Sequence, residues 1–117
     1  MKTKQQIAEE NKDAREKFLR GERQDLEKFL ELVHFEQIYK GIEEKLAQSY
    51  VNTGVFRALI NLDEYMPSEK YKFHHWNRDA LRYKAREVVR KELTKNGYTI
   101  DRVNGLLLDI SAEHEKY

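Results

Sequence analysis

The chain lacks cysteine entirely, and it has a single proline and five glycines among its 117 residues. Without cysteine it can form neither disulfide bonds nor metal sites built from thiolates. Its apolar runs are also short. None approaches the roughly 20 residues that a membrane-spanning helix requires, and no apolar signal-peptide core follows the N-terminus. These absences lead us to expect a cytoplasmic protein that does not contact a membrane.

Charge, in contrast, is abundant: charged residues make up 37% of the chain and apolar residues 39%. The apolar positions recur at the spacing of helices, and a chain of this length can bury a core without cross-links. We therefore predict an all-α fold in which residues 1–117 form a single compact domain of four to six helices.

The first 50 residues are predicted to be an acidic, helical N-terminal part of this domain. Thr3 is positioned to cap a first helix that ends at Gly21, and two further helices follow. The first helix has only a thin apolar stripe, which includes Ile7 and Phe18. Such a stripe predicts either a frayed end or a partner, for example a second copy in a homodimer built on residues 3–50.

Turn residues divide the middle of the chain. An apolar run over residues 55–62 follows Gly54, and we predict it to be a short helix, with a strand as the alternative. A basic helix is then predicted within residues 68–97. Asn77 is one candidate for its N-cap, and the helix ends before Gly97.

Residues 98–117 are open to two interpretations. The spacing of the apolar residues between Ile100 and Ile110 fits a helix, which we favour. However, Asn104-Gly105 is also the preferred two-residue turn of a β-hairpin. A helix followed by a hairpin is how a winged-helix domain ends, so the hairpin alternative would link this segment to nucleic-acid binding.

The most informative feature is a concentration of positive charge between Lys70 and Gly97. This stretch holds nine basic and three acidic residues, whereas both flanking segments are acidic and the whole chain carries a net charge of +1. Four of its arginines recur at every fourth position, so a helix over residues 77–95 would carry them as one ridge. We call these four residues the arginine ridge: Arg78, Arg82, Arg86 and Arg90.

On that helix one arc of apolar residues is predicted to face the core, which leaves most of the basic side chains outward. The arc consists of Leu81, Ala85, Val88, Val89 and Leu93. Guanidinium groups bind phosphate through paired hydrogen bonds, and cations interleaved with aromatic rings suit single-stranded nucleic acid. We therefore predict a non-enzymatic binding protein that contacts DNA or RNA. The predicted contact residues are Lys70, Tyr71, Lys72, His74, Arg78, Arg82, Tyr83, Lys84, Arg86, Arg90 and Lys91.

Two other interpretations of the ridge stay open. The acidic segments of the same chain can neutralise it, with Phe73 and Trp76 packed in the core rather than exposed to bases. An acidic protein partner can also meet it. In either case the chain would be a small interaction module, such as an inhibitor, an adaptor or a homodimeric accessory protein of phage or plasmid type.

No residue pattern predicts catalysis, a metal site or a cofactor. His74 and His75 are adjacent, so they point to different sides of a helix and do not make the two-histidine face of a zinc site. Paired carboxylates such as Asp63-Glu64 are neighbours along the chain, which is poor geometry for acid and base catalysis. The glycines are too far apart to form a phosphate-binding loop.

Overall fold

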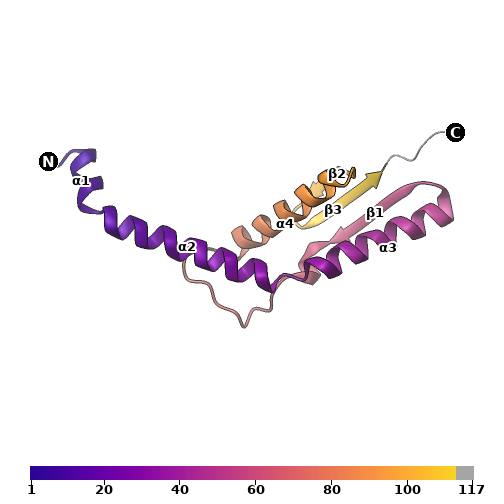
Figure 1. Cartoon of the computed structure of the whole chain (residues 1–117), viewed down its shortest axis with the longest axis horizontal. Helices are drawn as coiled ribbons and strands as arrows, with labels where there is room; N and C mark the ends of the chain where they lie inside the picture. The colour runs from indigo at the N-terminus through magenta and orange to yellow at the C-terminus, as the bar shows by residue number, and fades with distance from the viewer. Residues whose placement is uncertain (113–117) are drawn as a thin grey trace.

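The computed structural model describes residues 1–112, so the end of the predicted segment 98–117 lies outside the described part. Within that part, four α-helices accompany a three-stranded antiparallel sheet (Figure 1), and the all-α prediction is therefore wrong. In chain order the elements are α1 (Lys4–Glu10), α2 (Lys12–Leu32), α3 (Phe35–Thr53), β1 (Phe56–Asn61), the 3-10 turn η1 (Leu62–Tyr65), α4 (Arg78–Lys95), β2 (Thr99–Asn104) and β3 (Leu107–Ala112).

The sheet has β3 at its centre, paired with β1 on one side and β2 on the other. Because both pairings are antiparallel, β1 and β2 run parallel to each other, and α4 crosses between them in a split βαβ arrangement. The predicted helix over residues 55–62 is wrong, since this run forms β1. Buried Ala58 and Ile60 alternate with exposed Arg57 and Leu59, which is the two-residue period of a strand.

The C-terminal segment forms the hairpin of β2 and β3 rather than the favoured helix. Gly105 lies in the turn with a φ of +59°, a left-handed conformation that glycine adopts without steric cost. A bulge just after Ile100 explains the helix-like spacing of the apolar residues. It brings Ile100 and Val103, three positions apart, onto the same face, opposite Ile110 and Leu108 respectively.

The core lies between one face of the sheet and the helices α3 and α4. Its main buried residues are Ile38, Ile42 and Leu46 of α3, Leu81, Ala85, Val89 and Leu93 of α4, Ala58, Ile60, Leu108 and Ile110 of the sheet, and Phe29 and Val33 at and after the end of α2. The predicted inward arc of α4 is thus confirmed except at Val88, which is 37% exposed. Leu59 points to the other face of the sheet and is 53% exposed, so no element covers it there.

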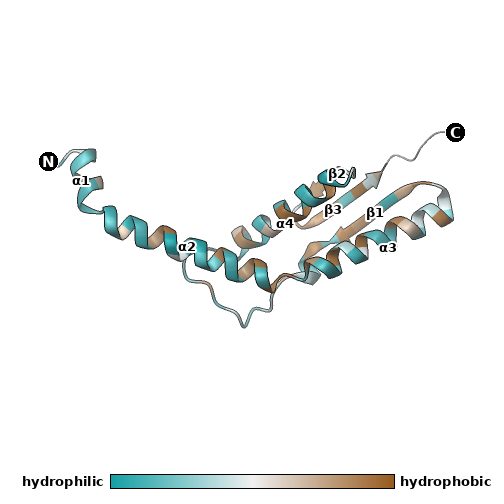
Figure 2. Cartoon of the chain, in the orientation of Figure 1, coloured by the Kyte–Doolittle hydropathy of each residue, from teal (hydrophilic) through white to brown (hydrophobic). Residues whose placement is uncertain are grey.

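The first 20 residues project away from this packed part (Figure 1) and are exposed throughout. α2 continues without a break through Gly21, so the predicted end of the first helix at that residue is wrong. The molecule extends over 70 × 32 × 20 Å, and its radius of gyration is 19.6 Å, against roughly 13 Å for a compact chain of this length. Figure 2 shows that the projection is largely hydrophilic. We call residues 4–20 the N-terminal arm.

Candidate functional site

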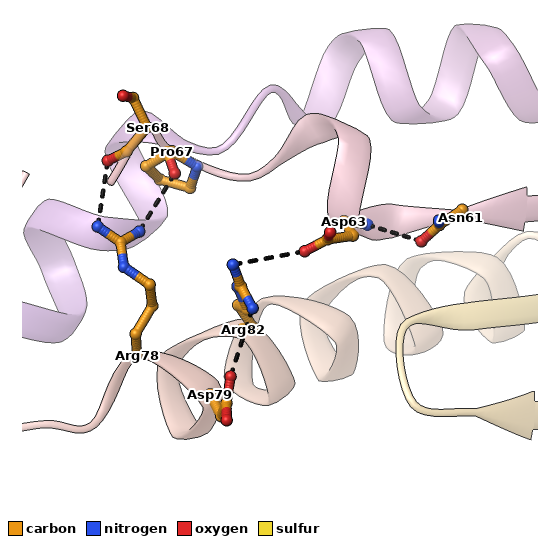
Figure 3. A network of polar contacts seen from close by, with 7 residues as sticks. All are labelled: Asn61, Asp63, Pro67, Ser68, Arg78, Asp79 and Arg82. Atoms are coloured by element: carbon orange, nitrogen blue, oxygen red, sulfur yellow. Dashed lines mark hydrogen bonds and ion pairs between the residues drawn. The ribbon is translucent and has the colours of Figure 1, made fainter. Parts of the chain in front are cut away.

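The arginine ridge is held by atoms of the chain itself, beginning with Arg78. Its guanidinium donates hydrogen bonds to the backbone carbonyl oxygens of Pro67, Ser68 and Tyr71, at 3.2, 3.1 and 2.7 Å. Figure 3 shows the first two of these bonds, which tie the loop before α4 to the start of that helix. Asn77 caps the helix as predicted, by accepting a hydrogen bond from a backbone N–H of the first turn. Arg78 therefore acts as a clamp for the loop.

Arg82 lies between two carboxylates (Figure 3). Its guanidinium is 3.6 Å from Asp63 of η1 and 3.3 Å from Asp79, one helical turn away. The side chain of Arg82 is only 25% exposed. Since Asp63 belongs to the acidic part of the chain before Lys70, the ridge is neutralised here from within.

Arg86 and Arg90 share the carboxylate of Glu87, at 3.4 and 3.0 Å. Arg86 also donates to the carbonyl oxygen of Gly105 in the hairpin turn, at 2.9 Å, and its guanidinium lies 4.7 Å from the ring centroid of Tyr83. Burial alone would raise the pKa of Glu87, but the hydrogen bond and charge of Arg90, together with those of Arg86, hold that pKa below its ordinary value. All four ridge arginines thus have partners inside the chain.

The ring-rich segment before α4 packs against α2. Phe73 meets Phe29 edge-on with 5.5 Å between ring centroids, and the Trp76 indole N–H donates to a backbone carbonyl of α2 at 2.9 Å. His75 lies directly over Gly21, where a Cβ would come 2.3 Å from the imidazole Nε2. The lack of a side chain at Gly21 therefore leaves room for this imidazole. Phe73 and Trp76 pack against the core, as expected from the interpretation in which the acidic segments of the chain neutralise the ridge.

The other predicted contact residues lie at the surface. Lys72, His74, Tyr83, Lys84 and Lys91 are exposed, Tyr71 is half-buried, and Lys70 lies 5.2 Å from the ring centroid of Tyr71. Lys84, Lys91 and Lys95 follow one another along the outward side of α4, and within residues 1–112 none of them has a carboxylate partner. We call these three residues the lysine face. The sequence prediction missed Lys95, although its spacing of four residues from Lys91 was a usable signal.

The N-terminal arm is the second surface with functional potential. Thr3 caps α1 as predicted, in a reciprocal capping box with Gln6. No residue of α1 is buried. Three apolar side chains of the arm stand in solvent: Ile7 is 49%, Phe18 43% and Leu19 40% exposed. Phe18 meets the ring of His75 edge-on, with 5.5 Å between ring centroids, but α1 and its side chain Ile7 have no such contact within the described residues.

A groove between α3 and α4 is the third such surface, and sequence reasoning did not find it. Its first hollow, of about 200 Å³, is lined by Tyr39, Ile42, Glu43, Glu92, Leu93, Asn96 and Tyr98. Its second hollow, of about 320 Å³, is lined by Glu43, Leu46, Ala47, Phe56, Tyr98 and Ala112. Because Glu43 and Tyr98 line both, we treat the two hollows as one feature, the α3–α4 groove.

The α3–α4 groove is acidic. Glu43 and Glu92 face it from α3 and α4, and neither hollow is lined by a lysine or an arginine. Burial and the negative charge of Glu92 raise the pKa of the Tyr39 hydroxyl above its ordinary value. The lining of the groove comes from α3, α4, the link after α4 and the strands β1 and β3, which lie far apart in the sequence, so no local pattern predicts the groove.

Comparison with known proteins gives no match: no protein-family model, no curated protein and no solved structure matches the chain. No helix within residues 1–112 combines the length and the apolar composition needed to cross a bilayer. In the same residues, no three histidine, aspartate or glutamate side chains are grouped to hold a metal ion. Three surfaces of the described residues are therefore candidates for binding a partner: the arm, the lysine face and the groove.

Proposed function

We propose that this chain is a non-enzymatic, cytoplasmic binding protein that binds another protein chain through its N-terminal arm. One observation carries the proposal: the arm is helical and bears apolar side chains, yet every residue in it is exposed. The arm extends the molecule to a length of 70 Å, so a partner can reach the arm without displacing the packed part.

The energetics of an isolated helix support this proposal. A helix shorter than about 12–15 residues is marginal in water, because nucleation is costly and no tertiary contact compensates for it. α1 has seven residues and is supported by local contacts: its capping box, the Lys2–Glu10 ion pair, a hydrogen bond from the Asn11 amide to the Ile7 carbonyl, and its junction with α2. Full burial of a side chain such as Ile7 or Phe18 contributes about 1.5–3 kcal/mol, so a partner that covers this side would stabilise the arm.

Site-specific photo-crosslinking in the native host tests the proposal. A photoreactive phenylalanine analogue replaces Ile7 or Phe18 on the apolar side and, as a matched control, Glu9 or Glu16 on the opposite side of the helix. We expect a protein adduct of one defined mass from the first pair of positions and not from the second. Equal adducts from both sides, or none at Ile7 and Phe18, would contradict the proposal.

A second candidate function is nucleic-acid binding through the lysine face, with Lys70 and Lys72 beside it. A contrast within α4 favours this function: among the described residues the lysine face has no carboxylate partner, whereas each ridge arginine has a partner inside the chain. Lys72 and the lysine face are linked through Trp76, since Lys72 lines the same hollow as Trp76 and Lys84 lies 5.7 Å from its ring centroid. Lysines placed in this way bind phosphates as point charges.

Titration with labelled single- and double-stranded DNA and RNA at two salt concentrations tests this candidate. The variant Lys84→Ala/Lys91→Ala/Lys95→Ala is compared with Lys12→Ala/Lys17→Ala/Arg20→Ala, which removes the same charge from the arm. We expect weaker binding only for the first variant, with a salt dependence reduced by about two to three phosphate contacts. Equal affinities of the two variants would rule out the lysine face.

A further inference from the structure

The α3–α4 groove has the chemistry of a receptor for a cationic, amphipathic segment. Its first hollow has a carboxylate on either wall, Glu43 from α3 and Glu92 from α4. Its second hollow is lined mainly by apolar side chains, among them Leu46 and Phe56. The two hollows adjoin at Glu43 and Tyr98. A ligand that fills both must therefore present a cation next to an apolar side chain.

α1 carries such a pair of side chains on one face. Lys4 and Ile7 are three positions apart, which makes them neighbours, about 5–6 Å apart, on the surface of a helix. Ile7 is 49% exposed, and Lys4 is exposed and forms no ion pair with the described residues 1–112, whereas Lys2 is held by Glu10 at 2.6 Å. Residues 1–8 contain no acidic side chain. The charge of this segment is thus complementary to that of the groove.

A chain cannot fill its own groove with its own arm. α1, which carries Lys4 and Ile7, lies at one end of the molecule, and α3 with the sheet lies at the other, while α4 begins beside α2 (Figure 1). α2 separates α1 from α3 as one continuous helix of 21 residues, which is about 30 Å long. This helix would have to break for the arm to fold back. The arm that enters the groove must therefore belong to a second copy of the chain.

We infer that the N-terminal arm of one copy docks in the α3–α4 groove of a second copy, with Lys4 between Glu43 and Glu92 and Ile7 in the apolar hollow. This inference rests on the proposed function of the arm and names its partner. The two contacting surfaces are different, so the contact is head-to-tail. Each docked pair still has one free arm and one free groove, so further copies add head-to-tail unless these two also dock in each other, which closes a two-fold dimer.

Sedimentation velocity of two complementary variants tests the inference. The arm variant is Lys4→Gln/Ile7→Gln, and the groove variant is Glu43→Lys/Ala47→Lys; all four positions are exposed, and circular dichroism checks that both variants fold. The matched control for the groove variant is Gln24→Lys/Glu27→Lys, which makes the same change of charge on the exposed side of α2.

The inference predicts a specific pattern of assembly. The assemblies of the wild-type chain and of the control increase in size with protein concentration. Each complementary variant alone stays a monomer, because its self-association is at least tenfold weaker than that of the wild type. An equimolar mixture of the two variants forms a one-to-one dimer and nothing larger, because it contains one intact arm and one intact groove. A wild type that stays monomeric overturns this inference but leaves the arm free to bind a different protein. Assembly that survives in the groove variant, and is lost only in the arm variant, also overturns it and assigns the arm another contact.

Discussion

Arg78 should contribute more to stability than the outermost arginine of the ridge, Arg90, and the substitution Arg78→Ala tests this. Removal of the guanidinium leaves the carbonyl oxygens of Pro67, Ser68 and Tyr71 without their donor. It also removes the cation that lies 5.9 Å from the ring centroid of Phe73. The loop before α4 would then lose the contacts that hold it to the helix.

The magnitude follows from how these bonds are shielded. A hydrogen bond to a charged group contributes about 1.5–3 kcal/mol, and the bonds from Arg78 to Pro67 and Tyr71 are partly buried. The third bond, to Ser68, is exposed and contributes little. Arg78→Ala should therefore lower the free energy of unfolding by about 2–4 kcal/mol. Arg90 pairs with Glu87 where both side chains are over 40% exposed. Arg90→Ala should therefore cost at most about 1 kcal/mol.

Urea unfolding followed by tryptophan fluorescence measures the difference, since Trp76 is the only tryptophan. With a slope of roughly 1–3 kcal/mol per molar urea, the midpoint should fall by about 1–2 M in Arg78→Ala and by about 0.5 M or less in Arg90→Ala. Arg78→Lys keeps the charge but lacks the planar fork, so it should behave like Arg78→Ala. Equal midpoints for the two alanine variants, or a wild-type midpoint for Arg78→Lys, would refute the clamp.

Three further predictions follow from local geometry. Gly21→Ala places a Cβ against the imidazole of His75, which is exposed and can turn away, so the gain in helix propensity of about 1 kcal/mol should raise the urea midpoint; a lowered midpoint would contradict this. Deletion of residues 1–10 removes no buried side chain, so calorimetry should show a loss of stability within about 0.5 kcal/mol. Because the pKa of Glu87 is lowered from 4.5, its ion pairs stabilise the fold above that pH, and this stability is lost as pH falls through the lowered pKa. Glu87→Gln should therefore make unfolding less sensitive to acid than in the wild type, and identical acid profiles would contradict the assignment.

The helical elements were accessible from the sequence because their signals are local. Thr3 and Asn77 are capping residues that act within one turn, and the inward arc of α4 follows from a spacing of four residues. The strands were missed because β1 has only six residues, and because the bulge after Ile100 makes an apolar strand look helical. Gly21 lies inside α2 and faces His75, and no local pattern indicates a contact between residues so far apart in the sequence.

The spacing of the candidate site was predictable, whereas its partners were not. The arginine ridge does lie along one helix, as its spacing predicts. Whether those arginines are free depends on Asp63 and Gly105, which reach Arg82 and Arg86 only after the loop and the hairpin have folded. The α3–α4 groove likewise arises from the way two helices lie on the sheet. Charge patterning therefore located the basic helix but not which of its basic side chains have partners within the chain.

The most direct test of head-to-tail docking uses the absence of native cysteine. One chain carries Ile7→Cys in the arm, the other carries Ala47→Cys in the groove, and the two are mixed under mild oxidation. Docking predicts a mixed disulfide dimer that forms faster than either homodimer, and faster than a dimer between Ile7→Cys and the exposed control Gln24→Cys. A mixed dimer no faster than this control, or a dominant Ile7→Cys homodimer, would contradict the docking of the arm in the groove.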